Sequence, residues 1–200
     1  MIFNNALIKY NLYRKKFYDQ KYNISASELF ELILTKKINK PKFHFFEFLT
    51  NLISLILSII TIFKCKFLNV NTANYFIIFN NNFSDPRSNN INMKINLDKR
   101  VNIIKVSGLS LSLLTFFRFK NVIFHESIVY FSRFFFKEKK FSLLEKYRNI
   151  HKCKTRQHYV YYKIFKFLKI KKFIMIDDYR EIQIFINICK KLNIKSIGYM

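Results

Sequence analysis

The chain contains very little glycine or proline. Among its 200 residues are two glycines, two prolines and no tryptophan. Phosphate-binding loops of the GxxxxGK[ST] and GxGxxG types need several glycines at fixed spacing, because their backbone closely approaches the phosphates. The only glycines are Gly108 and Gly198. The sequence therefore argues against P-loop ATPases, protein kinases and glycine-rich dinucleotide-binding domains.

Cysteine is also scarce, and the start of the chain lacks a long apolar run. Cys65, Cys153 and Cys189 are odd in number and far apart, which is not the pattern of a disulfide scaffold. Asn4 and Asn5 interrupt the first apolar residues, so we expect no secretory signal peptide. Both observations predict a reducing, cytoplasmic setting.

Acidic residues are few: 12 Asp and Glu stand against 36 Lys and Arg, for a net charge of +24. A charge of this size predicts anionic partners, either nucleic acid or an anionic lipid surface. Only 8 of the 36 cations are arginine, the residue that reads bases by bidentate contacts. Lysine, like the other abundant types Phe, Tyr, Ile and Asn, is encoded by AT-rich codons. The charge alone therefore predicts no sequence-specific reader.

The sequence is nonetheless rich enough in apolar residues, at 50%, to form a core. Short apolar runs bounded by polar residues predict parallel strands buried on both faces. These runs lie at 75–79, 101–106, 121–125, 173–176 and 194–199. Helical patterns lie at 109–119, 126–136, 141–151, 155–169 and 179–192. This alternation predicts an α/β fold, a Rossmann-like parallel sheet flanked by helices, over residues 71–200.

An N-terminal helical extension is predicted over residues 1–70. Residues 2–22 form a loosely amphipathic basic pattern, and Ser25 with Glu28 makes a capping box for a helix that stops before Pro41. The segment between Pro41 and the strand at 75–79 includes the most apolar part of the chain.

The most apolar stretch runs from Phe48 to Phe63 without a charge. As a helix it would span about 24 Å, less than the ~30 Å hydrocarbon core of a bilayer. Polar residues recur along one narrow stripe, at Thr50, Ser54, Ser58 and Thr61. This pattern predicts a helix that is buried on the sheet or lies at a membrane surface, with a membrane span as the alternative.

The end of the chain carries the candidate binding residues. A predicted buried strand runs directly into Asp177 and Asp178, and Arg180 follows. Ligands of open α/β sheets bind at the carboxyl ends of the strands, so these three residues are candidate substrate-binding residues. Two structural alternatives remain open: Asp178 has the spacing of a helix N-cap paired with Glu181, and Asp177 with Arg180 would form an ion pair.

This last segment resembles a known family. The run KKFIMIDDYRE, a helix with Cys-Lys near its end and then LNIKSIGYM are similar to the last βαβ unit in the N-terminal half of GT-B-type glycosyltransferases of bacterial surface polysaccharide biosynthesis. The specific resemblance covers residues 171–200, and the architectural one covers 75–200. It implies a transfer from a nucleotide sugar that needs no metal and no bound cofactor.

The resemblance also implies a division of labour. The N-terminal half would bind the acceptor, a glycan or a lipid-linked sugar, and a second domain would bind the nucleotide sugar. In the family that domain follows the segment that ends here at Met200. We therefore expect the 200 residues to be inactive alone.

Candidate catalytic residues are His125, Glu126 and Asp177. His125 and Glu126 close the third predicted strand, where a base could reach an acceptor hydroxyl. The alternative is a packed histidine beside a carboxylate that starts a helix. His151, Cys153 and His158 lack the spacing of a zinc site, so we expect no metal.

For localisation, we expect peripheral attachment to the inner face of the cytoplasmic membrane through a helix over 43–66 and its lysines. The alternative functions are a basic nucleic-acid-binding protein of an AT-rich genome and a membrane-associated adaptor without enzymatic activity. The first of these draws on the net charge and on the run 159–172, which interleaves aromatic residues with lysines.

Overall fold

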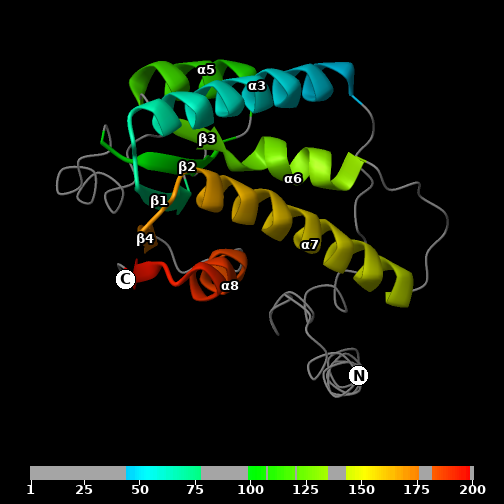
Figure 1. Cartoon of the computed structure of the whole chain (residues 1–200). Coiled ribbons are helices and arrows are strands. Elements are labelled where there is room, and N and C mark those ends of the chain that lie inside the picture. The colour runs from blue at the N-terminus through cyan, green and yellow to red at the C-terminus, as the bar shows by residue number, and fades with distance from the viewer. Residues whose placement is uncertain are drawn as a thin grey trace.

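The protein forms a parallel sheet flanked by helices (Figure 1). In the computed structural model the described residues are 44–77, 99–106, 108–119, 121–134, 143–175 and 182–198. The predicted helices over 2–22 and from Ser25 to Pro41 lie outside them, as do Asp177, Asp178 and Arg180.

Five strands make up the sheet, and every neighbouring pair is parallel. The strand order is β3-β2-β1-β4-β5. The strands are β1 (Thr72–Ile77), β2 (Val101–Lys105), β3 (Val122–Phe124), β4 (Lys172–Met175) and β5 (Lys195–Gly198). The chain thus adds β2 and β3 on one side of β1 and then crosses over to add β4 and β5 on the other side, as in Rossmann-like folds. The predicted α/β fold with a parallel sheet is confirmed.

The prediction that every strand is buried on both faces is wrong for β5. Its residues Lys195, Ser196 and Gly198 are exposed and Ile197 is half-buried. The reason is its position, because β5 is an edge strand that pairs only with β4 among the described strands. By contrast, Val122, Ile123 and Phe124 of the other edge strand, β3, are all buried, because helices cover that edge.

Three helices cover one face of the sheet: α6 (His125–Phe134), α7 (Leu143–Phe167) and α8 (Ile182–Leu192). The sequence pattern predicted two helices over 141–151 and 155–169, and this was wrong, since α7 runs continuously through both. The residues that join them, Lys152 to Lys154, include neither glycine nor proline, so nothing in the sequence breaks the helix there.

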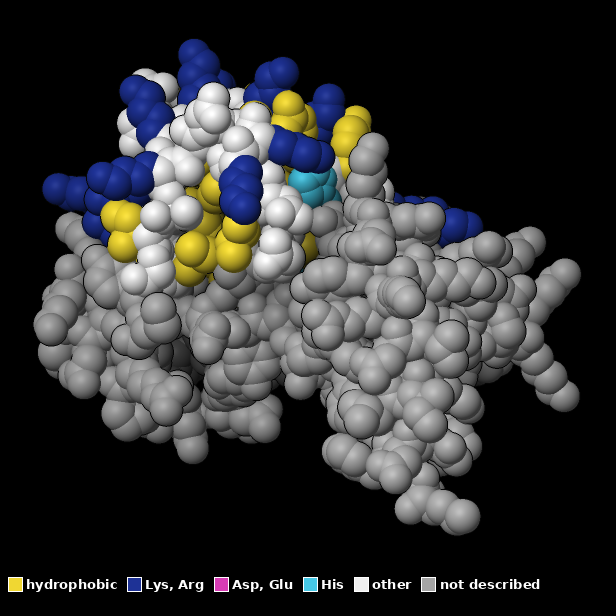
Figure 2. All heavy atoms as spheres, turned by 90° about the horizontal axis from the view of Figure 1, so that it is seen from below, with side chains coloured by type: hydrophobic (Ala, Val, Ile, Leu, Met, Phe, Trp, Pro, Cys, Tyr) yellow, Lys and Arg dark blue, Asp and Glu magenta, His cyan; other side chains and the backbone are white. Residues whose placement is uncertain are grey.

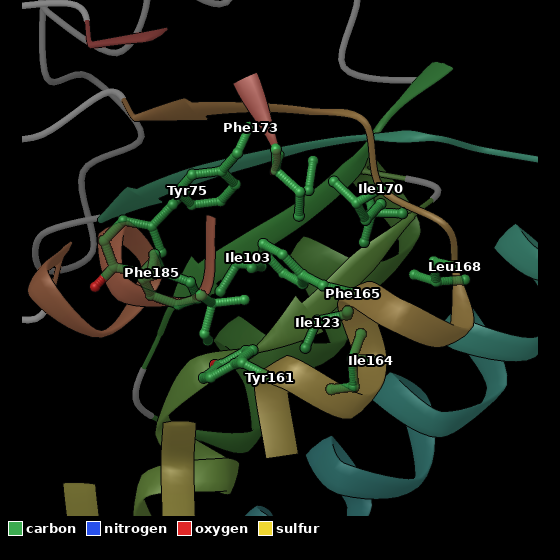
Figure 3. Packing of buried hydrophobic residues seen from close by; sticks show 14 of the residues in the cluster. Tyr75, Ile103, Ile123, Tyr161, Ile164, Phe165, Leu168, Ile170, Phe173 and Phe185 are labelled. Atoms are coloured by element: carbon green, nitrogen blue, oxygen red, sulfur yellow. The ribbon is translucent and has the colours of Figure 1, made fainter. Parts of the chain in front are cut away.

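Aromatic rings fill the space between the sheet and these helices (Figure 3). Phe185 of α8 is at the centre: its ring centroid lies 4.6 Å from that of Tyr75, 4.7 Å from that of Tyr161 and 5.2 Å from that of Phe173. All four side chains are fully buried. A single aromatic core therefore joins one face of the sheet to α7 and α8.

The remaining two helices, α3 (Phe45–Phe67) and α5 (Leu109–Arg118), lie on the opposite side (Figure 1). Leu57 of α3 and Phe116 of α5 pack on a second, smaller core cluster that includes Ile104, Phe124 and Ile174. Helix α3 also places Leu55 and Ile62 against the first cluster. It therefore straddles the β3 edge of the sheet, between α5 and α6, and contacts both helices.

The polar stripe of α3 is turned toward the protein. Ser54, Ser58 and Thr61 are buried, together with Cys65 one turn further on. The Phe124 amide of the edge strand donates a hydrogen bond to Ser58 Oγ at 2.9 Å, and Ser58 Oγ donates to the Ser54 carbonyl at 2.8 Å. These small residues thus bring α3 close to the sheet and provide an acceptor for an edge amide. On the other side of α3, the apolar residues Ile56, Ile59, Ile60 and Phe63 are exposed.

Candidate functional site

The sheet has a topological switch point between β1 and β4. Strand β1 pairs with β2 on one side and with β4 on the other, so the chain connections leave in opposite directions from this point. In open α/β sheets such a point opens a crevice at the carboxyl ends of the strands, where ligands bind. In this chain β1 ends at Ile77 and β4 ends at Met175 on either side of the switch point.

Asp177 comes two positions after Met175, the last residue of β4. Asp178 and Arg180 follow before α8 begins at Ile182. The three predicted binding residues thus belong to the segment that leaves β4 at the switch point, although their side chains lie outside the described residues. Met175 is in register with Tyr75 of β1 and with Gly198 of β5, so these strand ends form one edge.

A turn at the end of β2 approaches the same edge. Gly108 has φ of 100° and precedes α5. Residues with a side chain rarely adopt this conformation, so the turn requires glycine. Open space surrounds the position that a Cβ would take, so the constraint comes from the backbone and not from crowding. Ser107, its neighbour, lies outside the described residues.

His125 begins α6 directly after β3 and is fully buried. Its Nδ1 shares a hydrogen bond with the Tyr161 hydroxyl at 2.6 Å, and the two rings stack with centroids 5.7 Å apart. The ring of Tyr75 lies edge-on at 5.8 Å. A base must come within hydrogen-bond reach of the acceptor, and a ring enclosed in this way has no surface for one. This burial fits the alternative interpretation of His125, a histidine packed in the core.

Glu126, the next residue, occupies a different environment. Its Oε1 lies 3.6 Å from Lys105 Nζ, and both side chains are 32% exposed. Lys105 is the last residue of β2 and Glu126 follows β3, so the pair lies at the carboxyl edge of the sheet. Of the two adjacent candidates, Glu126 is therefore the one with access to solvent, at the carboxyl edge of the sheet.

Sequence reasoning missed Lys105 as a partner of Glu126. The sequence pattern places Lys105 only within the predicted strand at 101–106. One feature of the sequence could have indicated the pair: Lys105 is a charged residue at the end of a mostly apolar strand. The carboxyl ends of β2 and β3 lie side by side, which brings Lys105 close to Glu126. In isolation, an exposed pair of this kind contributes little to stability.

A buried polar network between β1 and β2 was also missed. Asn74 Nδ2 donates to Asn102 Oδ1 at 3.0 Å, and Asn102 Nδ2 donates to the Arg100 carbonyl at 3.2 Å. Arg100 Nη1 lies 3.5 Å from Asn74 Oδ1. Both asparagines are fully buried and in register. The network fixes the pairing of the two strands well before their carboxyl ends, so its role is structural.

The run 159–172 divides its aromatic rings between the core and the surface, where Tyr159 and Phe167 are exposed. Tyr161 and Phe165 are buried in the core, whereas Lys163 and Lys166 point outward. Tyr159 is exposed, but Lys163 Nζ lies over its ring, 5.3 Å from the centroid. Successive bases need a row of open aromatic faces for stacking. The alternation of aromatic residues and lysines therefore reflects the two sides of α7.

The cysteines are free and buried. Burial raises the pKa of Cys65, Cys153 and Cys189 to about 11. Such thiols are protonated near neutral pH and so are poor nucleophiles. Within the described ranges, no group of three or more His, Cys, Asp or Glu side chains is placed to hold a metal ion. Comparison with protein-family models, curated proteins and solved structures finds no significant match to this chain.

Proposed function

We propose that the chain is the acceptor-side domain of a glycosyltransferase that uses nucleotide sugars, and that it acts at a membrane surface. The observation that supports the proposal most is the strand order, which puts a switch point between β1 and β4. The DDYR segment follows β4 at that point, and it is the segment that resembles GT-B enzymes. Carboxylates and a guanidinium suit the hydroxyl and phosphate groups of sugars and sugar nucleotides.

The proposed transfer forms a bond between an acceptor hydroxyl oxygen and the anomeric carbon of the donor sugar, and the nucleoside diphosphate leaves. The hydroxyl proton goes to a carboxylate. Asp177 and Glu126 are the candidates for this base: Asp177 follows β4, and Glu126 is half-exposed at the end of β3.

The test is acceptor binding measured by saturation-transfer NMR with a panel of short oligosaccharides. Asp177→Asn and Arg180→Ala should weaken binding about 10-fold or more, because a hydrogen bond to a charged group contributes about 1.5–3 kcal/mol. Glu47→Gln and Arg133→Ala are matched controls at exposed positions and should bind as the parent does. Equal binding by all four variants, with a loss of thermal stability in Asp177→Asn and Arg180→Ala, would make the DDYR segment structural only.

Membrane attachment is proposed through α3. This helix is long and apolar enough to cross a bilayer, with a mean hydropathy of 2.0, which alone is weak evidence. Its outward side chains Ile56, Ile60 and Phe63 are about half exposed, at 48%, 52% and 55%. A soluble protein rarely leaves such a surface open to water. We place it on the inner face of the cytoplasmic membrane.

An interfacial position fits α3 better than a span. The helix contacts β3, α5 and α6 along its length, and Ser58 accepts the Phe124 amide. Crossing the bilayer would separate α3 from the sheet and leave polar groups of both in hydrocarbon, which is costly. Release of the protein from membranes by high salt with alkali is expected, and resistance to that extraction would indicate a span.

A further inference from the structure

The exposed apolar side chains of α3 continue onto α5. Helices α3 and α5 contact each other, and their buried sides carry the small residues Thr61 and Thr115. Outward from this contact lie large apolar side chains that we call the apolar corner. They are Ile60, Phe63, Phe67 and Leu68 at the end of α3, with Leu114 and Phe117 on α5, and their exposures run from 52% to 85%.

The apolar corner lies toward the amino edge of the sheet. Helix α3 ends at Phe67 shortly before β1 begins at Thr72, and α5 ends at Arg118 shortly before β3 begins at Val122. Helix α7 ends at the same edge, where the ring of Phe167 lies 6.0 Å from that of Phe63. Lys66 Nζ donates to the Phe167 carbonyl at 2.8 Å. These contacts join the three helix ends into one surface.

Charge is distributed unevenly along α3. Its last turn carries Lys64 and Lys66, and Lys166 and Lys169 are exposed at the adjoining end of α7. The first turn of α3 instead carries an exposed carboxylate, Glu47. Among the side chains that the structure describes, the only other carboxylate is Glu126, which is at the carboxyl edge. Anionic headgroups would attract one end of α3 and repel the other.

We infer that the apolar corner, ringed by Lys64, Lys66, Lys166 and Lys169, is the surface that enters an anionic bilayer. The protein then docks with its amino edge lower, and its carboxyl edge, with the proposed ligand site, tilts away from the headgroups. The combination of bulky apolar side chains and surrounding lysines matches the two components of interfacial binding, insertion and headgroup attraction. This inference rests on the membrane attachment proposed above and not on the proposed transfer.

The native cysteines make a labelling experiment direct. Burial raises their pKa values to about 11, so a cysteine introduced at the surface reacts selectively with a fluorophore near neutral pH. Phe117→Cys places the label in the apolar corner. Phe46→Cys is the matched control, because Phe46 is 80% exposed and Phe117 is 79% exposed, but Phe46 is next to Glu47 at the other end of α3.

The labelled full chain is mixed with phosphatidylcholine vesicles, with or without phosphatidylglycerol, that contain bromine-labelled lipid as a quencher. We expect the label at position 117 to be quenched more strongly than the label at 46, and only when phosphatidylglycerol is present. Stronger or equal quenching at 46 would overturn the orientation, and no vesicle binding at all would overturn the attachment as well. Concentration-dependent self-association that shields position 117 without vesicles would assign the corner to a second copy of the chain instead.

A pair of charge variants tests the lysine ring separately. Lys166→Gln with Lys169→Gln should weaken binding to phosphatidylglycerol vesicles about 30-fold, from the usual contribution of two headgroup-facing cations. The control, Lys190→Gln with Lys191→Gln, removes the same charge from the last turn of α8. This helix packs beside β5, the edge strand farthest from β3 and α3. Figure 2 shows the lysine-rich face below the sheet, on the side away from α3. Equal losses in both pairs would overturn the docking surface in favour of overall charge.

Discussion

At the residue scale, burial sets the chemistry of the cysteines. The pKa of each thiol is raised from 9.0 to about 11 by burial, so the folded state holds its thiol protons more tightly than the unfolded state does. The stabilisation that comes from these protons is complete below pH 9 and is lost as the pH rises from about 9 to about 11.

Thiol reactivity checks this account. At pH 8 we expect no reaction of the folded protein with a chromogenic disulfide reagent over minutes, and reaction of three thiols per chain after addition of denaturant. Rapid reaction of one thiol in the folded protein would show that its helix opens locally, which contradicts the packing described for that cysteine.

His158 gives a second prediction at this scale, on the acid side. Desolvation lowers its pKa, and Lys191 lowers it further. The unfolded state therefore binds the proton more readily, so the contribution of His158 to stability is present above about pH 6.5 and is lost as the pH falls. His158→Gln should reduce the loss of stability between pH 7.5 and 5.5 in urea unfolding.

At the element scale, α3 depends on the hydrogen bond that Ser58 accepts from the β3 edge. Ser58→Ala leaves the buried Phe124 amide without this acceptor, which should lower the free energy of unfolding by about 1–3 kcal/mol. Ser110→Ala is the matched control, since Ser110 is exposed on α5. Urea denaturation measures both variants. A Ser58→Ala protein as stable as the parent would mean that the polar stripe does not anchor the helix.

The elements also show what the sequence allows one to predict. Short, mostly apolar runs such as Val101–Lys105 are typical of buried strands or of pieces of buried helices. Their short length correctly favoured strands. The division of α7 was wrong because a run of lysines and polar residues resembles a linker, although it contains no helix breaker. The direction of the α3 stripe was not predictable, because it depends on an edge amide, that of Phe124, 66 residues away.

The sequence predicted where the candidate site lies better than it predicted the contacts that its residues make. The strand that runs into Asp177 and the neighbouring strand ends fall at one edge, as parallel pairing requires. The packed interpretation of His125, by contrast, needed the position of Tyr161 on α7 and of Tyr75 on β1. Pairing between Lys105 and Glu126 likewise depends on the order of β2 and β3, which a sequence does not specify.

At the scale of the whole molecule, three surfaces have different characters. The carboxyl edge carries the switch point between β1 and β4, α3 and α5 turn apolar side chains outward, and lysines gather on the α7 and α8 side (Figures 1 and 2). With the apolar corner in the bilayer, as we propose, the carboxyl edge faces water, where an oligosaccharide acceptor can reach it. The central claim is that ligand binds at this edge.

Hydrogen exchange with mass spectrometry tests that claim most directly. The exchange of the chain is compared with and without a saturating oligosaccharide from the binding panel, with Asp177→Asn in parallel. We predict that protection on binding appears in the peptides that follow β1 and β4, which contain residues 78–98 and 176–181, and that it is lost in Asp177→Asn. Protection that appears instead on α7 and the lysines of the amino edge, or protection that Asp177→Asn leaves intact, would contradict the claim.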